Sequence, residues 1–137
     1  MINYWVFKSE PDCWSWQQQV QKGEIGEEWS GVRNFEARNN MLKMKLGDKG
    51  FFYHSNKERA IVGIVEISKK AHKDSTSQTE QWQCVNIKAL RSFKNPISLT
   101  QIKDHPLLQH IALVKRARLS VAPIDKIAWQ IICDLGN

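Results

Sequence analysis

Two long strand-like segments follow one another in the middle of the chain, and they limit the folds that this sequence can adopt. Residues 60–67 form a β-branched apolar run, and residues 82–93 alternate apolar with polar side chains. Gly63 inside the first segment predicts a bulge or a close approach of another group to the backbone. Residues 68–81, rich in Ser, Thr, Lys and Gln, predict a surface loop. Long strands with so little room for crossover helices argue against a doubly wound parallel sheet.

Shorter strands are predicted on both sides of this pair. Residues 2–7 and 51–53 are rich in β-forming side chains, and residues 119–121 predict one more short strand. The first strand should stop before Pro11, and the second long segment should break at the Asn-Pro pair that ends in Pro96, because proline cannot donate to a strand ladder.

Capping residues predict where helices begin. Ser15 with Gln18 and Ser98 with Gln101 have the spacing of a capping box. Asn34 is a candidate N-cap for another helix. The apolar face of that helix would carry Ala37, Met41 and Met44.

The last helix is expected to start at Pro123 and Asp125. Its spacing predicts one apolar stripe, made of Ile127, Ile131 and Leu135. The order of elements predicts an α+β fold, with a mixed, curved β-sheet or small open barrel and helices packed outside. We expect one domain over residues 1–137.

The charge of the chain favours a polyanionic partner. Lys and Arg total 20 against 14 Asp and Glu, a net charge of +6. No basic amphipathic helix, transmembrane run or signal peptide is predicted, so we expect no membrane partner. The three cysteines are far apart, which is typical of unpaired thiols in a reducing compartment. We therefore expect a cytoplasmic location, with association with the nucleoid as an alternative. We also expect a monomer, because nothing in the sequence demands an oligomer.

Patterns for catalysis or metal binding are weak. His54 and Ser55 are adjacent, but neighbours along a strand point to opposite faces, so they do not predict a nucleophile with its base. No cysteine lies near another, no phosphate-binding glycine loop is present, and Cys13 is interpreted as a loop or core thiol. We expect no metal, no cofactor and no enzyme, although a hydrolase that uses His54 and a carboxylate stays an alternative. The histidines that lack ligand spacing are His54, His72, His105 and His110.

The remaining residue types favour a site for a nucleobase. Residues 29–34 place an aromatic ring, a glycine and an arginine directly before a helix N-terminus, which suits an anion. Aromatic rings stack on a base, amides and hydroxyls read its edge, and cations hold the phosphates. The plainer alternative is an ordinary capped helix with solvated arginines, a Trp5 in the core and a solvated basic cluster. The candidates from the residues alone are Trp5, Trp29, Phe35 and Tyr53, then Ser9, Asn34, His54, Ser55 and Asn56, then Lys8, Arg33, Arg38, Lys115, Arg116 and Arg118.

Sequence blocks along nearly the whole chain resemble the EVE domain family. The main blocks are residues 4–12 (YWVFKSEPD), 29–34 (WSGVRN), 37–39 (ARN), 47–48 (GD) and 52–55 (FYHS), followed by 63–66 (GIVE), 96–99 (PISL) and 119–123 (LSVAP). The blocks keep the family's order. The main departure is at Cys13-Trp14, which we expect to affect the helix entry and not the pocket. A long basic N-terminal tail found in nuclear relatives is absent, so we do not expect a nuclear location.

This resemblance implies a PUA-like fold that reads a modified base. Related members are linked to 5-methyl- and 5-hydroxymethyl-cytosine in DNA, and other PUA-like domains bind RNA, so an RNA-binding domain for tRNA or rRNA remains an alternative. The implied mechanism flips a base into a pocket, where Trp29 stacks on it. The implied base-binding residues are Trp5, Lys8, Ser9, Glu10, Trp29, Val32, Arg33, Asn34, Tyr53, His54 and Ser55, and the implied phosphate-binding residues are Arg38, Lys115, Arg116 and Arg118.

Overall fold

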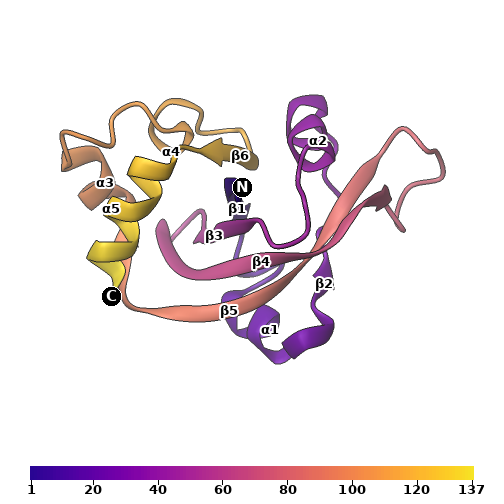
Figure 1. The fold of residues 1–137 in the computed structure, drawn as a ribbon, viewed down its shortest axis with the longest axis horizontal. Coiled ribbons are helices and arrows are strands. Elements are labelled where there is room, and N and C mark those ends of the chain that lie inside the picture. Colours follow the sequence, from indigo (N-terminus) through magenta and orange to yellow (C-terminus); the bar gives the residue numbers. More distant parts are fainter.

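Six strands form one curved mixed sheet in the order β2-β5-β4-β3-β1-β6 in this computed structural model, which describes residues 1–137 (Figure 1). β1 and β3 are parallel, and the other neighbours are antiparallel. The predicted α+β class with a curved mixed sheet is confirmed. The strands are β1 (Tyr4–Ser9), β2 (Glu27–Glu28), β3 (Lys49–His54), β4 (Ala60–Lys73), β5 (Gln83–Ser98) and β6 (Val121–Ile124).

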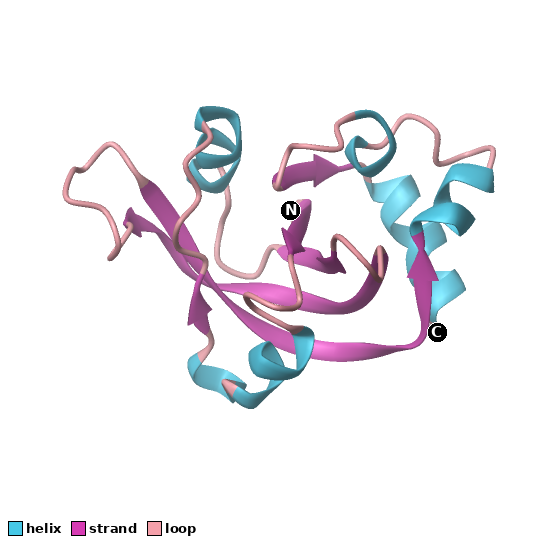
Figure 2. Ribbon diagram, turned by 180° about the vertical axis from the view of Figure 1, so that it is seen from behind, coloured by secondary structure: helices cyan, strands magenta, loops and turns pink.

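Helices cover the two halves of the sheet. Figures 1 and 2 show α3, α4 and α5 gathered at one end, with α1 and α2 on opposite sides of the other half. The helices are α1 (Trp16–Gln21), the 3₁₀ helix η1 (Gly23–Ile25), α2 (Phe35–Leu42), α3 (Leu99–Asp104), α4 (Ala112–Lys115) and α5 (Lys126–Gly136). None of them combines the length and the apolar character needed to cross a membrane.

The helix starts predicted from capping residues are confirmed. Both capping boxes form, at Ser15 with Gln18 and at Ser98 with Gln101. The Oδ1 of Asn34 accepts the Ala37 backbone N–H at 2.9 Å and caps α2. The predicted apolar face of α2 is buried as well.

β1 and β3 are buried on both faces, because a separate hydrophobic core packs against each face. Successive side chains of each strand point in opposite directions and so enter the two cores in turn. Trp5, Phe7 and Phe52 belong to a core that packs against α1 and α2. Val6 and Tyr53 belong to a second core that packs against α3, α4 and α5. Two of the rings expected to line a pocket, Trp5 and Tyr53, are therefore core residues.

The hairpin of β4 and β5 is longer than the sequence predicted. The polar residues 68–73 belong to β4 and pair with β5 as far as Lys73 and Gln83, so only residues 74–82 connect the strands. Figure 1 shows that the tip of this hairpin projects beyond the rest of the sheet, which suits the many polar side chains of its connection.

Two predictions that rested on prolines were wrong for the same reason: a strand end at Pro96 and a helix start at Pro123. Pro96 lies inside β5, where the ladder is irregular between the pairs Ile61–Ile97 and Gly63–Ser92. Pro123 lies inside β6, at the edge of the sheet, and does not start the last helix. At both positions a missing N–H removes no regular ladder bond.

The inward face of α5 also differs from the prediction. Ile127 is 71% exposed, and Leu135 is exposed too. Trp129 faces the core instead, where its ring stacks on Phe51 at a centroid distance of 4.0 Å and on Tyr4 at 4.5 Å. The large ring sets the rotation of the helix about its axis, which the spacing of the isoleucines could not indicate.

The predicted close approach of another group to Gly63 is confirmed. A Cβ atom at this position would lie 2.2 Å from the ring of Trp16. The irregular register next to Gly63 confirms the predicted bulge. The missing side chain therefore lets α1 seat its tryptophan directly on the sheet.

Candidate functional site

One open cavity lies between the end of β1 and the loop that precedes α2. Its volume is about 710 Å³, which is within the range of small-molecule sites. Residues 8–10 and 29–34, expected to face each other, both line it. The complete lining is Lys8, Ser9, Glu10, Cys13, Trp14, Glu27, Glu28, Trp29, Ser30, Gly31, Val32, Arg33, Asn34 and Ser120.

Two tryptophans form the aromatic part of this lining. The Trp29 ring packs edge-on against Phe7 at 5.3 Å and Phe52 at 5.7 Å, and its backbone N–H donates to the Val85 carbonyl at 2.8 Å. Trp14 is half-buried, and its indole N–H donates to the Gln19 side chain at 2.9 Å. Both indoles are therefore held by contacts within the protein rather than left mobile.

The expectation that Cys13-Trp14 lies away from the pocket was wrong, because both residues line the cavity. The chain turns back after β1, where the Cys13 and Trp14 backbone N–H groups donate to the Glu10 carbonyl. The Ser9 hydroxyl donates to the Trp14 carbonyl at 2.5 Å. These hydrogen bonds hold residues 13 and 14, which lead into α1, against the cavity.

Lys8 joins two parts of the cavity wall. Its ammonium group donates to the carbonyls of Arg116 and Ala117 at 3.0 and 3.1 Å. Its backbone N–H donates to the Ser120 carbonyl at 2.8 Å. Burial lowers the pKa of Lys8 from its ordinary value. Ser120 lines the cavity but was not predicted, because only this long-range pairing brings residues 116–120 beside β1.

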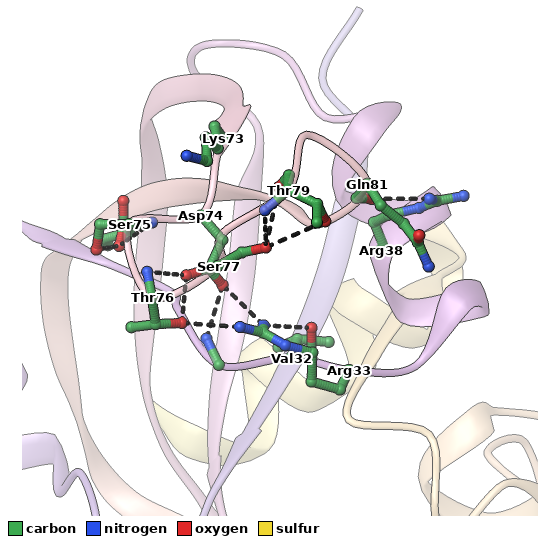
Figure 3. A network of polar contacts seen from close by, with 12 residues as sticks. Val32, Arg33, Arg38, Lys73, Asp74, Ser75, Thr76, Ser77, Thr79 and Gln81 are labelled. Atoms are coloured by element: carbon green, nitrogen blue, oxygen red, sulfur yellow. Dashed lines mark hydrogen bonds and ion pairs between the residues drawn. The ribbon is translucent and has the colours of Figure 1, made fainter.

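The loop before α2 is anchored by Asp74, at the start of the hairpin connection (Figure 3). The Asp74 carboxylate accepts hydrogen bonds from the Gly31 backbone N–H at 2.8 Å and from the Thr76 backbone N–H and hydroxyl at 2.7 and 2.6 Å. It also pairs with the Arg33 guanidinium at 3.3 Å. Burial by itself raises the pKa of Asp74, but these hydrogen bonds outweigh burial, and the pKa lies below its ordinary value.

The backbone conformation of Gly31 allows its N–H to donate to Asp74. Its φ of +83° is a conformation that favours glycine, and it aims the N–H at Asp74. Sequence reasoning missed Asp74 because it belongs to a polar segment interpreted as an undifferentiated loop.

The expected third wall of the pocket does not form. None of Trp5, Tyr53, His54 and Ser55 lines the cavity. The Trp5 indole N–H donates to the buried Asp48 carboxylate at 3.1 Å. Burial raises the pKa of Tyr53. The Ser55 backbone N–H donates to the Ser9 carbonyl at 2.9 Å. Of these four residues, Ser55 bonds directly to a residue of the lining, Ser9.

His54 is held at both ring nitrogens. Its Nε2 accepts the Trp16 backbone N–H at 2.9 Å, so Nδ1 carries the proton and donates to Glu58 at 2.5 Å. A catalytic base would have to break one of these bonds. The geometry therefore gives no support to the alternative in which His54 acts in a hydrolase.

The predicted phosphate-binding cations fall into two groups. Arg38 donates to the Gln81 carbonyl at 2.8 Å and to the Asn39 side chain, and Arg116 forms a two-pronged ion pair with Glu36. Lys115 and Arg118 are exposed, and their side chains form no hydrogen bond or ion pair within the chain. Only the second group presents cations without a protein partner.

Three potential metal ligands lie close together, and one of them, Glu28, lines the cavity. The donor atoms of Glu28, His72 and Cys84 are all within 4.8 Å of one another, a grouping that sequence spacing did not indicate. Burial, with a contribution from Glu28, raises the pKa of the Cys84 thiol to about 12. The Glu28 carboxylate accepts hydrogen bonds from Ser75, and His72 Nε2 contacts the Asn86 side chain at 2.8 Å. Glu28 and His72 already have partners within the protein, and we assign no metal to these three residues.

Comparisons with known proteins find relatives that match nearly the whole chain. Residues 3–135 match the sequence profile of the EVE domain. Thymocyte nuclear protein 1 of Gallus gallus is 35% identical over 169 residues, covering 96% of this chain and 68% of that protein.

Solved structures extend the similarity to the whole fold. A protein from Agrobacterium tumefaciens is 50% identical, with a TM-score of 0.97 over 98% of this chain and 93% of that one. Human THYN1, solved in complex with 5-methylcytosine containing DNA, is 29% identical, with a TM-score of 0.91 over 98% of both chains. The YTH domain of Zygosaccharomyces rouxii MRB1, 17% identical with a TM-score of 0.57 over 98% of this chain and 86% of that one, shares the fold alone.

Proposed function

This chain belongs to the EVE domain family, and on that basis we propose that it binds nucleic acid and reads a modified base of the 5-methylcytosine type in DNA. The observation that carries the proposal is the open cavity of about 710 Å³ between residues 8–14 and 27–34. A base would be flipped out of its stack and enter this cavity. The human relative, solved with 5-methylcytosine DNA, supports the same class of ligand.

Stacking on the two cavity tryptophans would offset the cost of flipping. Extruding a base costs a few kcal/mol, and stacking on an aromatic side chain returns about 1–3 kcal/mol per base. Trp29 is fixed by the core and Trp14 by Gln19, so little conformational entropy would be lost when a base binds.

The polar groups of the lining suit the edge of cytosine. That edge offers an exocyclic amine as donor and a ring nitrogen and a carbonyl as acceptors. The carboxylates of Glu10 and Glu28 can accept from the amine, and Lys8 and the Asn34 amide can donate. Asn34 would serve both as helix cap and as ligand, because its Oδ1 caps α2 and its NH₂ stays available.

The proposal is tested by a binding screen at fixed salt. Oligonucleotides would carry unmodified cytosine, 5-methylcytosine, 5-hydroxymethylcytosine or methyladenine, in single- and double-stranded DNA and in RNA. We expect the wild type to prefer a modified cytosine in DNA. Equal affinity for modified and unmodified DNA would contradict the proposal, and tighter binding of RNA would favour the alternative of an RNA-binding domain.

Replacing Trp14 tests directly whether a base binds in the cavity. Trp14→Ala should weaken binding of the preferred oligonucleotide by about 1–3 kcal/mol, because one stacking surface is lost. Ile127→Ala, an exposed position of α5 outside the cavity, is the control and should bind as the wild type does. A Trp14→Ala variant that is folded by circular dichroism and binds with unchanged affinity would remove Trp14 from the site.

A further inference from the structure

Two aromatic rings far apart in the sequence stack on each other beside the cavity. Phe35, the first residue of α2, is 52% exposed, and Trp82, directly before β5, is half-buried. Their ring centroids are 4.8 Å apart with an interplanar angle of 24°. We refer to Phe35 and Trp82 as the aromatic platform. An exposed single hydrophobic residue is ordinary, but an exposed stacked pair is a surface on which another flat group can stack.

Two guanidinium groups flank the aromatic platform. The Arg33 guanidinium carbon lies 5.5 Å from the centroid of the Trp82 ring, and that of Arg38 lies 4.9 Å from Phe35. Both arginines are anchored, Arg33 by Asp74 and Arg38 by the Gln81 carbonyl, as Figure 3 shows. The rings and charges are therefore held in place before any ligand arrives.

This combination has the chemistry of a nucleotide site. Aromatic faces bind bases with little regard to sequence. Arg38 has only uncharged partners within the protein, so its charge can attract a neighbouring phosphate, whereas Arg33 is paired with Asp74. The chain's net charge of +6 favours the same polyanionic ligand. An acidic peptide would use the cations but not the flat faces of the rings.

The aromatic platform is separate from the cavity but continuous with its rim. Phe35 and Trp82 do not line the cavity, whereas Arg33 and Asn34 do, and Phe35 is the next residue along the chain. We propose that the aromatic platform binds a second nucleobase, that of an unpaired nucleotide neighbouring the base held in the cavity on the same strand. This inference rests on the proposed function and adds a subsite to it.

The test compares single-stranded DNA oligonucleotides carrying one 5-methylcytosine. In one series both neighbours are intact, and in two others the 5′ or the 3′ neighbour is replaced by an abasic spacer. Phe35→Leu keeps an apolar side chain but removes the aromatic face. It should weaken binding of the intact oligonucleotide by about 5- to 150-fold, which is the range of one lost stacked base. On one of the two abasic oligonucleotides it should bind as tightly as the wild type.

Three further variants test whether the effect comes from the aromatic face. Phe35→Trp should retain the affinity, since it keeps an aromatic face. Trp82→Phe should retain most of it for the same reason. Leu42→Ala, an exposed position near the other end of α2, should have no effect.

The outcomes separate the two proposals. A wild type that does not distinguish modified from unmodified DNA overturns the proposed function. If the wild type does distinguish them, two results for Phe35→Leu overturn only the subsite. One is an equal loss of affinity on the intact and both abasic oligonucleotides, and the other is no loss of affinity at all. Concentration-dependent dimerisation of the wild type that Phe35→Leu abolishes, measured by sedimentation, would instead assign the aromatic platform to a second copy of the chain.

Discussion

Asp74 holds one wall of the cavity in place without lining it. Its buried carboxylate ties the hairpin connection to Gly31 and Arg33, which lie 43 and 41 residues away in the sequence. Since Gly31 and Arg33 line the cavity, the position of that wall is set by a side chain that does not itself touch the ligand space.

Replacing Asp74 should loosen the loop and destabilise the fold. Asp74→Ala leaves the Gly31 N–H and the Thr76 donors without their acceptor, which should lower the free energy of unfolding by about 1–3 kcal/mol. Affinity for the preferred oligonucleotide should fall as well. Urea denaturation and binding titration measure both, with Asp104→Ala at an exposed position of α3 as the control. Unchanged stability would show that the anchor is dispensable.

The lowered pKa of Asp74 also predicts a pH dependence. A carboxylate with a lowered pKa in the folded state stabilises the fold above its unfolded pKa of about 4, and this stabilisation is lost as the pH falls through the folded-state value. The stability difference between the wild type and Asp74→Asn should therefore shrink when urea denaturation is repeated from pH 7 down to pH 3. A difference that stays constant over that interval would contradict the role of the charge.

The cysteines should differ sharply in reactivity. Cys13 is exposed at the cavity, whereas Cys84 and Cys133 are buried, and burial raises the pKa of both thiols, to about 12 for Cys84. Because the thiolate is the reactive form, a thiol reagent at pH 8 should modify one cysteine in the folded protein and three in urea. Cys13→Ser should abolish the fast reaction, and more than one fast equivalent in the wild type would contradict this assignment.

At the scale of the elements, α5 shows which face of a helix the core selects. Ile132 is fully buried beside Trp129, whereas Ile127 points outward. The apolar spacing alone allowed either stripe, and contact with Phe51 and Tyr4 decided between them.

This difference predicts unequal effects of the same substitution. Ile132→Ala should lower the free energy of unfolding by about 2–5 kcal/mol, because it removes buried methyl groups and leaves a cavity. Ile127→Ala should change it by less than about 0.5 kcal/mol. Denaturant unfolding of the two variants is a direct comparison, and similar losses for both would mean that α5 is rotated differently.

For the whole molecule, the positive charge matters most where no internal partner neutralises it. Arg33 and Arg116 are paired with the carboxylates of Asp74 and Glu36, whereas Arg38 has only uncharged partners. Lys115 and Arg118 are exposed and have no partner, and they lie beside the segment that reaches the cavity at Ser120. A count of basic residues could not distinguish these groups.

Arg118 should therefore contribute to the salt dependence of binding. Arg118→Ala is expected to weaken binding to all oligonucleotides alike and to reduce the slope of log affinity against log salt by about 0.7–0.9, the value for one lost phosphate contact. Lys94→Ala, an exposed lysine of β5 outside the cavity, should leave the slope unchanged. Equal slopes for the wild type and both variants would remove Arg118 from the phosphate contacts.

The sequence by itself determined the features that depend on neighbouring residues. The cap at Asn34, the two capping boxes, the close approach at Gly63 and the α+β class all follow from local spacing and are confirmed. The family blocks also placed residues 8–10 and 29–34 on one cavity. The roles of these residues in binding a base remain predictions.

Only the tertiary structure decided which side chains reach that cavity. β1 and β3 alternate between two cores, so Trp5 and Tyr53 are buried, while the turn after β1 brings in Trp14. The length of the hairpin brings Asp74 and Trp82 to the loop before α2. Local sequence spacing sets the period of exposure along a strand or helix, but which face is buried, and against what, depends on packing between segments that are distant in the chain.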